Sequence, residues 1–85
     1  MSRSLFTEAY QCLLLAIIGA QLAAGLRQVD LAKRLGKPQS FVSKMETGER
    51  RLDVIEFLVV ARAMGADPHQ LISDVLMAMP ADTVI

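Results

Sequence analysis

The sequence has no tryptophan and few aromatic residues of any kind. Aromatic residues make up 5% of its 85 positions, although 53% of the chain is hydrophobic. The core must therefore be built from Leu, Val, Ile, Ala and Met, a composition that favours helices packed on helices over a sheet. A chain of this length also buries too little surface for a second independent core. We expect an all-α fold in a single domain that spans residues 1–85.

Cysteine occurs once, as Cys12, which excludes an intrachain disulfide. The chain also lacks a basic leader followed by a small-residue cleavage site. Its most apolar run, residues 12–20, has about half of the roughly 20 residues that are needed to cross a bilayer. These features predict a cytoplasmic protein that makes no membrane contact, with Cys12 as a core thiol.

Residues that would support catalysis, metal binding or cofactor binding are equally scarce. The single histidine, His69, has no second His or Cys at ligand spacing. The sequence also contains no convergent Ser, His and Asp set and no phosphate-binding glycine loop. We therefore expect no enzymatic activity, no metal and no cofactor.

The net charge is zero, because nine Lys and Arg balance nine Asp and Glu. These charges are unevenly placed along the chain. Residues 27–51 carry seven basic and three acidic side chains, a net charge of +4, whereas the other residues carry two basic and six acidic side chains, a net charge of −4. Such a chain can present a basic face to a polyanion while its acidic side keeps it soluble.

Capping residues, glycines and prolines divide the chain into five predicted helices. The first follows Ser4, covers about residues 5–24 and ends at Gly25, and its second half is apolar on every side. Asp53 and Asp67 are expected to cap the last two helices. The predicted ranges of the second to fifth helices are 28–35, 38–47, 54–64 and 68–79.

The second and third predicted helices form a helix-turn-helix pattern over residues 28–47. Both are short, a glycine-containing turn joins them, and the later one has a polar outer face, as in motifs that place a helix in the DNA major groove. Ala32 is small where the two helices must cross, and Gly36 permits the turn. The inward positions that hold the pair against the other helices are Leu31, Leu35, Val42 and Met45.

Residues 25–71 resemble the Cro/phage-repressor (XRE) family of helix-turn-helix regulators. The resemblance covers slightly more than half of the chain and includes the "ARAMGADP" ending of the fourth helix. It implies a five-helix lambda-repressor-like DNA-binding domain, here with an extended apolar first helix. It also implies a sequence-specific regulator of transcription, and we expect a repressor. The most specific matching positions are Gln28, Leu31, Ala32, Leu35, Gly36, Gln39, Ser40, Val42, Ser43, Glu46 and Gly48.

The resemblance assigns base readout in double-stranded DNA to the third helix and phosphate contacts to the residues around it. The chemistry of the side chains agrees, because Gln can pair with adenine, Lys can donate to guanine, and an exposed Phe41 can rest against a thymine methyl group. Glu46 is interpreted as a structural residue, either hydrogen-bonding or balancing the helix dipole, and not as a base reader. The expected base-reading residues are Gln39, Ser40, Phe41, Ser43 and Lys44. The expected phosphate-binding residues are Gln28, Lys37, Arg50 and Arg51.

Two features depart from the family pattern. Family members usually carry Ser or Thr as caps of the second and third helices, where this chain has Arg27 and Pro38, and a lost cap costs about 1 kcal/mol. The first helix of the family is commonly basic, but "LLLAIIGAQLAAG" in this chain has no basic residue. We therefore expect weaker caps and modest affinity for nonspecific DNA.

Apolar residues exceed what one small core readily hides. The predicted core face of helix 54–64 consists of Val54, Phe57, Leu58, Ala61 and Met64, yet Ile55 and Val59 fall on a second side. With the first helix and a dimerisation tail at residues 72–85, this surplus predicts a two-fold homodimer, for which a palindromic operator is the natural target. A larger monomeric core is the alternative structure. The alternative function is a protein-interaction module, such as an antitoxin-like partner of a toxin, with weak or no DNA binding.

Overall fold

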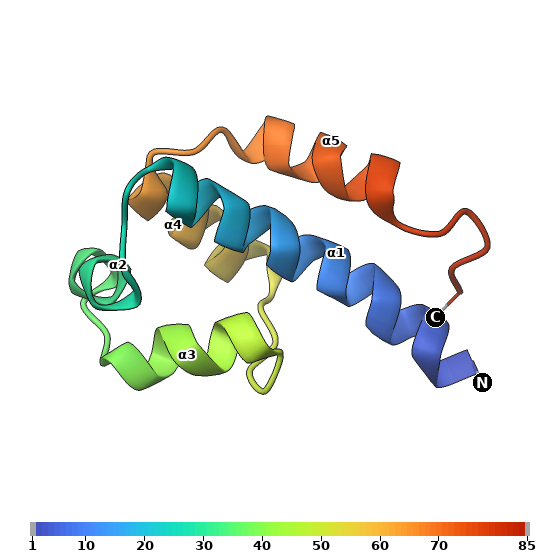
Figure 1. Ribbon diagram of the computed structural model, residues 1–85, viewed down its shortest axis with the longest axis horizontal. Helices are drawn as coiled ribbons and strands as arrows, with labels where there is room; N and C mark the ends of the chain where they lie inside the picture. Colours follow the sequence, from blue (N-terminus) through green and yellow to red (C-terminus); the bar gives the residue numbers. More distant parts are fainter. Residues whose placement is uncertain (1, 85) are drawn as a thin grey trace.

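The computed structural model describes residues 2–84, with side chains from residue 8 onward. Within these residues it has five helices and no strand, so the expected all-α fold is confirmed (Figure 1). The predicted boundaries of the second to fifth helices hold to within one residue. The helices are α1 (Ser2–Ala23), α2 (Gln28–Leu35), α3 (Gln39–Thr47), α4 (Val54–Met64) and α5 (Pro68–Ala78).

The long helix α1 begins earlier than the sequence indicated. It starts at Ser2, so the backbone of Ser4 lies inside the helix and not at its cap, and the Ser4 side chain is outside the described residues. At the other end, Gly25 adopts φ 71°, a left-handed conformation that favours glycine. There Gly25 and Leu26 donate their N–H groups to α1 carbonyls at 3.0 Å, which ends the helix as predicted.

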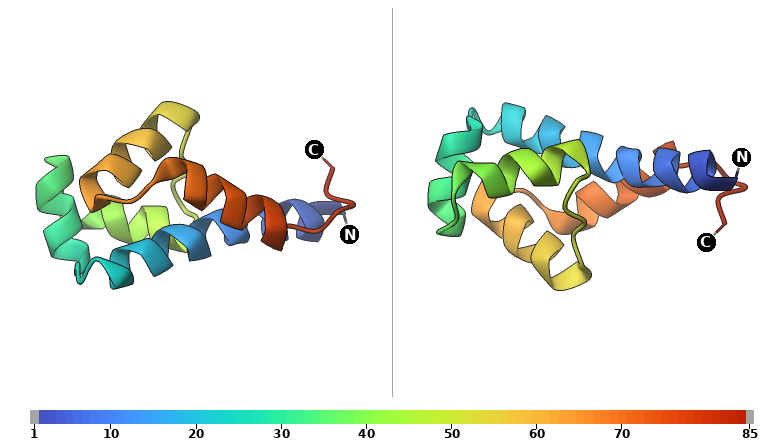
Figure 2. Two further views of the ribbon diagram at one scale, coloured as in Figure 1. Left: turned by 90° about the horizontal axis from the view of Figure 1, so that it is seen from above. Right: turned by 90° about the horizontal axis from the view of Figure 1, so that it is seen from below.

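The helices surround α1 on several sides. Figure 1 shows α5 above α1, α3 below it and α4 behind it, with α2 across one end. The views from above and below in Figure 2 agree: α5 runs along α1, and α2 packs against α3 and α4. Because α2 packs against α4 and α3 packs against α1, both helices that flank the turn are held by the rest of the fold.

Five large side chains are almost fully buried, and they come from α1, α2, α3 and α4. All four inward positions predicted for the helix-turn-helix contribute to the core: Leu31, Val42 and Met45 are fully buried, and Leu35 packs against them partly buried. The five most buried large side chains are Ile17, Leu31, Met45, Val42 and Val60.

The core face of α4 differs from the prediction. Val54 and Leu58 were expected in the core but are 72% and 37% exposed, whereas Val60 is buried. The prediction failed because α4 is apolar on more than one side, so the helical period alone could not choose between its faces. The buried set still follows i, i+3, i+4, i+7 spacing: Phe57, Val60, Ala61 and Met64.

The predicted caps of α4 and α5 are present. Asp53 accepts a hydrogen bond from the Glu56 N–H at 2.7 Å, and the Glu56 carboxylate accepts one from the Asp53 N–H at 3.0 Å. This reciprocal arrangement satisfies two backbone donors at once. Asp67 accepts from the His69 N–H at 2.9 Å, with Pro68 in the first turn of α5.

The length and hydropathy of α1 raise the question of a membrane span. Within residues 2–84 no single helix is both long enough and apolar enough to cross a bilayer. Residues 8–23 of α1 meet the criteria of length and composition only together with α2, and the two segments are bent by 97°.

Candidate nucleic-acid interface

The turn between α2 and α3 fixes how α3 is presented. Gly36 adopts φ 66°, and the Lys37 N–H donates to the Ala32 carbonyl at 3.0 Å, so α2 stops abruptly. Pro38 then occupies the N-cap position of α3 in an extended conformation. With Val42 and Met45 fully buried, α3 cannot rotate about its axis without exposing the core. Its opposite side is therefore held facing outward.

Three of the five expected base-reading residues lie on this outer side. Gln39, Ser40 and Lys44 are exposed, and Ser43 is half-buried. These polar groups have short or flexible side chains on one short helix. The face is therefore suited to contact with the edges of bases in a groove.

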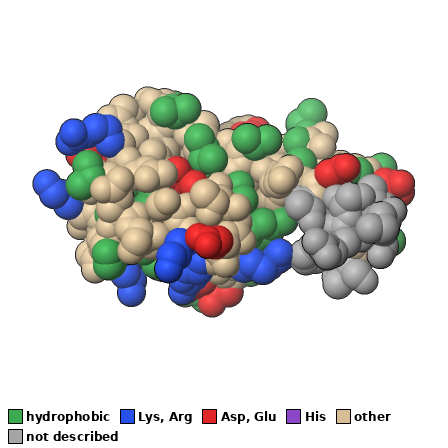
Figure 3. All heavy atoms as spheres, turned by 60° about the horizontal axis from the view of Figure 1, so that its bottom comes forward, with side chains coloured by type: hydrophobic (Ala, Val, Ile, Leu, Met, Phe, Trp, Pro, Cys, Tyr) green, Lys and Arg blue, Asp and Glu red, His purple; other side chains and the backbone are tan. Residues whose placement is uncertain are grey.

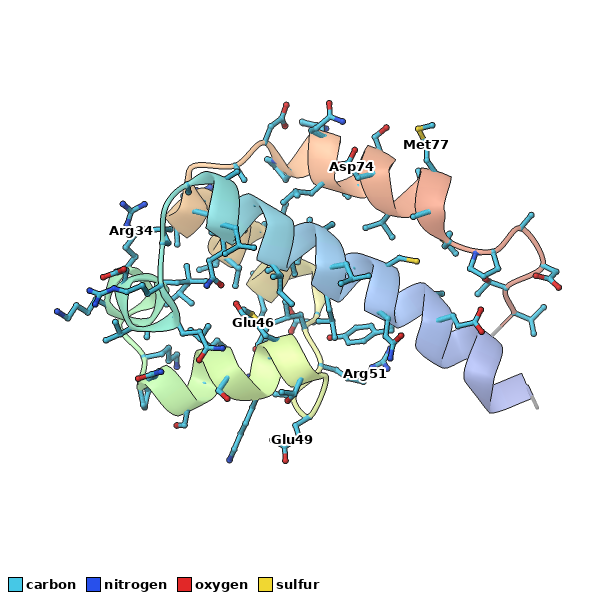
Figure 4. All side chains as sticks on the ribbon, viewed as in Figure 1. Arg34, Glu46, Glu49, Arg51, Asp74 and Met77 are labelled. Carbon is cyan, nitrogen blue, oxygen red and sulfur yellow. The ribbon has the colours of Figure 1, made fainter. Side chains whose placement is uncertain are left out.

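A hydrogen-bonded chain of side chains connects the two helices of the motif. Gln28 at the start of α2 donates from Nε2 to Oε1 of Glu46 at 2.9 Å, and Gln39 donates from Nε2 to Oε1 of Gln28 at 3.4 Å. In Figure 4 the side chain of Glu46 lies on the inner side of α3. Glu46 is thus a structural hydrogen-bonding residue, as expected. The chain limits the rotamers of Gln39 and Gln28 before any ligand binds.

Phe41 does not occupy the exposed position that the sequence suggested. It is half-buried and packs against the core. The Arg50 guanidinium lies 4.7 Å from the centroid of its ring, and the Lys37 ammonium lies 5.7 Å away. Both distances are within the range of cation–π attraction. The sequence suggested exposure because the neighbours of Phe41 in α3 are mostly polar, but its ring packs against the core and lines a hollow with residues of α2 and α4.

Arg50 was expected at the phosphates but forms an ion pair within the protein. Its guanidinium donates to both carboxylate oxygens of Glu56, at 3.2 and 2.7 Å, and also to the Arg51 carbonyl at 3.0 Å. These hydrogen bonds lower the pKa of Glu56 and raise that of Arg50. Arg50 therefore links α3, through Phe41, to the first turn of α4.

Arg51 is exposed and lies over an aromatic ring of α1. Its guanidinium carbon is 4.0 Å from the centroid of Tyr10, and the Tyr10 hydroxyl accepts a hydrogen bond from the Leu52 N–H at 2.9 Å. Tyr10 anchors the loop that carries both arginines, a role that the sequence analysis missed. One Tyr on a mostly apolar helix gave no spacing signal that could have identified it.

The caps of α2 and α3 agree with the expected departure from the family pattern, since neither Arg27 nor Pro38 makes a side-chain cap hydrogen bond. At α2 a different device replaces the missing cap. The Asp30 carboxylate accepts from the Arg27 N–H at 2.9 Å and pairs with the Arg27 guanidinium at 3.0 Å. The hydrogen bonds from the Arg27 side chain and backbone lower the pKa of Asp30 to about 2. An acidic residue three positions after the cap was the available signal.

The basic side chains gather where the sequence placed them. In Figure 3, Lys and Arg side chains line two edges of the face that carries α2 and α3. Glu49 points away from the body at the loop after α3 (Figure 4). The face is therefore basic at its margins and polar along α3, the distribution expected where margins meet phosphates and a helix meets bases.

Comparisons with known proteins agree with this geometry. The Helix-turn-helix family HTH_3 matches residues 21–71. An XRE-family like protein from Pseudomonas syringae pv. tomato str. DC3000 is 48% identical, with a TM-score of 0.84, over 94% of this chain and 100% of that chain. The clp gene regulator ClgR from C. glutamicum is 18% identical, with a TM-score of 0.76, over 87% of this chain and 96% of that chain, and shows the same fold. No curated protein matches significantly.

The family match and the 48% identical structure establish the helix-turn-helix family that the sequence pattern suggested. The family match covers the whole of α2, α3 and α4, and the 48% identical structure covers nearly the entire chain. The fold of this chain is lambda-repressor-like, and the family is a DNA-binding and non-enzymatic one. The chain belongs to the XRE family of Cro/C1-type helix-turn-helix DNA-binding proteins.

Proposed function

We propose that the chain is a sequence-specific repressor that binds double-stranded DNA with α3 in the major groove. The observation that carries the proposal is the fixed orientation of α3, whose inner residues Val42 and Met45 are fully buried while Gln39 and Lys44 stay exposed. Occupation of an operator suffices for repression, because it blocks other proteins from the same DNA. A cytoplasmic location belongs to the same proposal.

Within this proposal, base readout falls to the polar residues on the outer side of α3. Gln39 keeps its side-chain oxygen for an adenine while its amide group donates to Gln28. Lys44 can donate to the acceptors of guanine, and Ser40 and Ser43 can accept from or donate to either kind of base pair. Phe41 instead supports α3 from behind, because its half-buried ring packs against the core.

Phosphate contacts fall to Gln28, Lys37 and Arg51 in the same proposal. Gln28 stands at the N-terminus of α2, where backbone N–H groups and the helix dipole favour an anion. Lys37 and Arg51 flank α3 in the two loops and are exposed. Arg50 takes the separate role of holding the second loop in place through Glu56.

The proposal includes a two-fold homodimer, which would let two α3 helices read half-sites roughly 34 Å apart in a palindromic operator. An apolar groove of about 440 Å³ runs between α1, the start of α4, α5 and the tail that follows α5. Val54 and Leu76, both largely exposed, line it. Met77 also points outward from α5 (Figure 4). A second copy that covers this groove would remove these side chains from water.

Fluorescence anisotropy tests the DNA-binding part. Duplexes from the region upstream of the gene and duplexes of random sequence are titrated at several salt concentrations. We expect Lys44→Ala and Gln39→Ala each to cost about 1–3 kcal/mol on the preferred duplex and to relax specificity, whereas Arg51→Ala weakens every duplex alike. Absence of binding at low salt would overturn the proposal, and equal losses on every duplex would overturn the assignment of α3 to bases.

Sedimentation equilibrium tests the homodimer. The wild type should approach twice the chain mass of 9.3 kDa at micromolar concentration, and Leu76→Glu should return it to the monomer mass. Leu76 is 65% exposed, so this substitution leaves the core intact. A wild-type mass of one chain at all concentrations would contradict the dimer.

The alternative function, a module that binds another protein, has one observation in its favour. The outer side of α4 is apolar and exposed, and the hollow beside it shares no lining residue with the groove assigned to the second copy. A partner on this side is compatible with DNA binding by α3.

A further inference from the structure

The outer side of α4 carries a stripe of exposed apolar residues. Ile55 is 68% exposed, Val59 is 49% exposed and Leu58 is 37% exposed. Their spacing of three and four positions places them on one face of the helix. Single exposed apolar side chains are ordinary, but a contiguous stripe on a helix marks an interaction surface. We call these three residues the α4 stripe.

A hollow of about 230 Å³ lies beside the α4 stripe. Apolar side chains from α2, α3 and α4 line it, together with Lys37 and Arg50. A hollow of this kind next to an exposed helix face can receive an aliphatic or aromatic side chain from a second helix laid against α4. The apolar lining residues are Leu35, Phe41, Ile55, Val59 and Val60.

The charges around the stripe are mainly positive. Lys37 lies at the hollow, Arg62 is exposed three positions after Val59, and Arg34 is fixed at the end of α4 by a hydrogen bond to the Ala63 carbonyl at 2.9 Å. Glu56 also borders the hollow, but Arg50 pairs with it. Among the residues with described side chains, no carboxylate forms an ion pair with Lys37, Arg62 or Arg34.

A second copy of the chain does not suit this basic rim. A two-fold contact centred on the α4 stripe would bring the mainly basic rim of one copy against the mainly basic rim of the other, and like charges at an interface are unfavourable. Contact with a differently charged side of another copy would be head-to-tail, and such contacts form rings or open filaments and not a two-fold dimer. Neither arrangement therefore gives a two-fold dimer with complementary charges at the rim.

We propose that the α4 stripe and its hollow dock an acidic amphipathic helix from a different protein. The partner inserts an apolar side chain between Phe41, Ile55 and Val59 and places carboxylates beside Lys37 and Arg62. Docking itself does not depend on DNA binding. Docking would also affect DNA binding, because the partner and a DNA phosphate would compete for Lys37. This regulatory effect rests on the proposed function.

Titration of a synthetic helix into the isotope-labelled protein, followed by NMR, tests the docking. The probe is a peptide of about 15 residues with Leu at i, i+3, i+4 and i+7 and Glu at most other positions. A peptide of the same composition in permuted order is the control. We expect shifts centred on Ile55, Val59 and Lys37 with the amphipathic peptide only. No binding, or equal binding of both peptides, would overturn the proposal.

Matched variants locate the contact. Ile55→Ser should weaken binding of the peptide about tenfold, which corresponds to about 1.4 kcal/mol. Leu15→Ser on α1 is the control, because Leu15 has the same exposed fraction of 68%. Lys37→Glu should weaken binding further, since it reverses one charge of the rim. Equal losses in the Ile55 and Leu15 variants would place the peptide elsewhere and refute the proposal.

Two further measurements distinguish a failure of helix docking from a failure of DNA binding and from occupation of the stripe by a second copy. Lys44→Ala should lose specific DNA binding and retain the peptide, so a failure of the proposed DNA binding leaves the docking result standing. In sedimentation equilibrium, Ile55→Ser should leave the wild-type mass unchanged. If this variant instead dissociates a dimer, a second copy occupies the stripe and the proposal is wrong.

Discussion

Tyr10 offers a direct test of how α1 holds the loop between α3 and α4. Its hydroxyl accepts a hydrogen bond from the Leu52 N–H at 2.9 Å, and its ring faces the guanidinium of Arg51. Tyr10→Phe removes the hydroxyl and retains the ring. We expect the variant to unfold with a free energy lower by about 1 kcal/mol, because the Leu52 N–H is left without its partner.

The magnitude follows from how accessible the amide is. A neutral hydrogen bond contributes about 0.5–1.5 kcal/mol net, and an orphaned buried donor costs about 1–3 kcal/mol. Tyr10 and Leu52 are both half-buried, and the hydrogen bond between them is a neutral one that is only partly withdrawn from water. The lower range therefore applies. In a domain of this size, 1 kcal/mol lowers Tm by about 4–8 °C.

Circular dichroism during thermal and urea unfolding measures the loss, and amide hydrogen exchange locates it. Exchange at Leu52 should accelerate about fivefold if only the hydrogen bond is lost, since 1.4 kcal/mol corresponds to a factor of ten. Tyr10→Leu is the comparison variant, because it also removes the ring that Arg51 faces, and it should lose more stability. Unchanged Tm and unchanged Leu52 exchange in Tyr10→Phe would refute the reasoning.

Three other predictions concern the core, the turn and pH. Leu31→Ala, at a fully buried position, should lower the free energy of unfolding by about 2–5 kcal/mol in urea titrations; a loss below about 1 kcal/mol would contradict its burial. Gly36→Ala should lower the free energy of unfolding by about 1 kcal/mol, because Gly36 has a φ of 66°. Gly19→Ala should raise it by about 0.5–1 kcal/mol, because Gly19 lies inside α1 and nothing is within 4 Å of the added Cβ. Changes of the same sign for both variants in thermal scans would be inconsistent with this explanation. The pKa of Asp30 is lowered to about 2, so its stabilising effect is present above its unfolded pKa of about 3.9 and is lost as the pH falls through about 2. The Tm difference between wild type and Asp30→Asn should therefore shrink from pH 5 to pH 2, and a constant difference would exclude this origin.

Local signals in the sequence were sufficient for most of the fold. Gly25, Gly36 and Gly65 all adopt the left-handed conformation that ends a helix, and Asp53 and Asp67 cap the helices that follow them. Each of these signals acts within a few residues, so it does not depend on the tertiary structure. The period of apolar residues also identified the buried side of α2 and α3, because the other sides of those helices are polar.

The errors arose where a position depends on residues distant in sequence. α4 is apolar on two sides, and the packing of α1, α2 and α5 against it decides that Val60 is buried and Val54 is exposed. The same applies to Phe41, whose ring is covered by the core and flanked by Arg50 from the next loop. The Tyr10 contact with Leu52 spans 42 positions and has no local signature.

The structure also changes the meaning of the +4 charge in residues 27–51. Several of the seven cations are engaged within the protein, among them three arginines: Arg27 with Asp30, Arg34 with the Ala63 carbonyl, and Arg50 with Glu56. These three arginines fix the ends of α2 and α4 and the loop before α4. The affinity of a cation for phosphate depends on the counterions that binding releases, and a cation already paired with a carboxylate releases fewer of them. A count of basic residues therefore overstates the electrostatic attraction to DNA. Arg50 also fixes the loop after α3 through Glu56, and Arg34 ties the end of α2, just before the turn, to α4. In the proposed function, this fixed presentation of α3 favours specificity over nonspecific affinity.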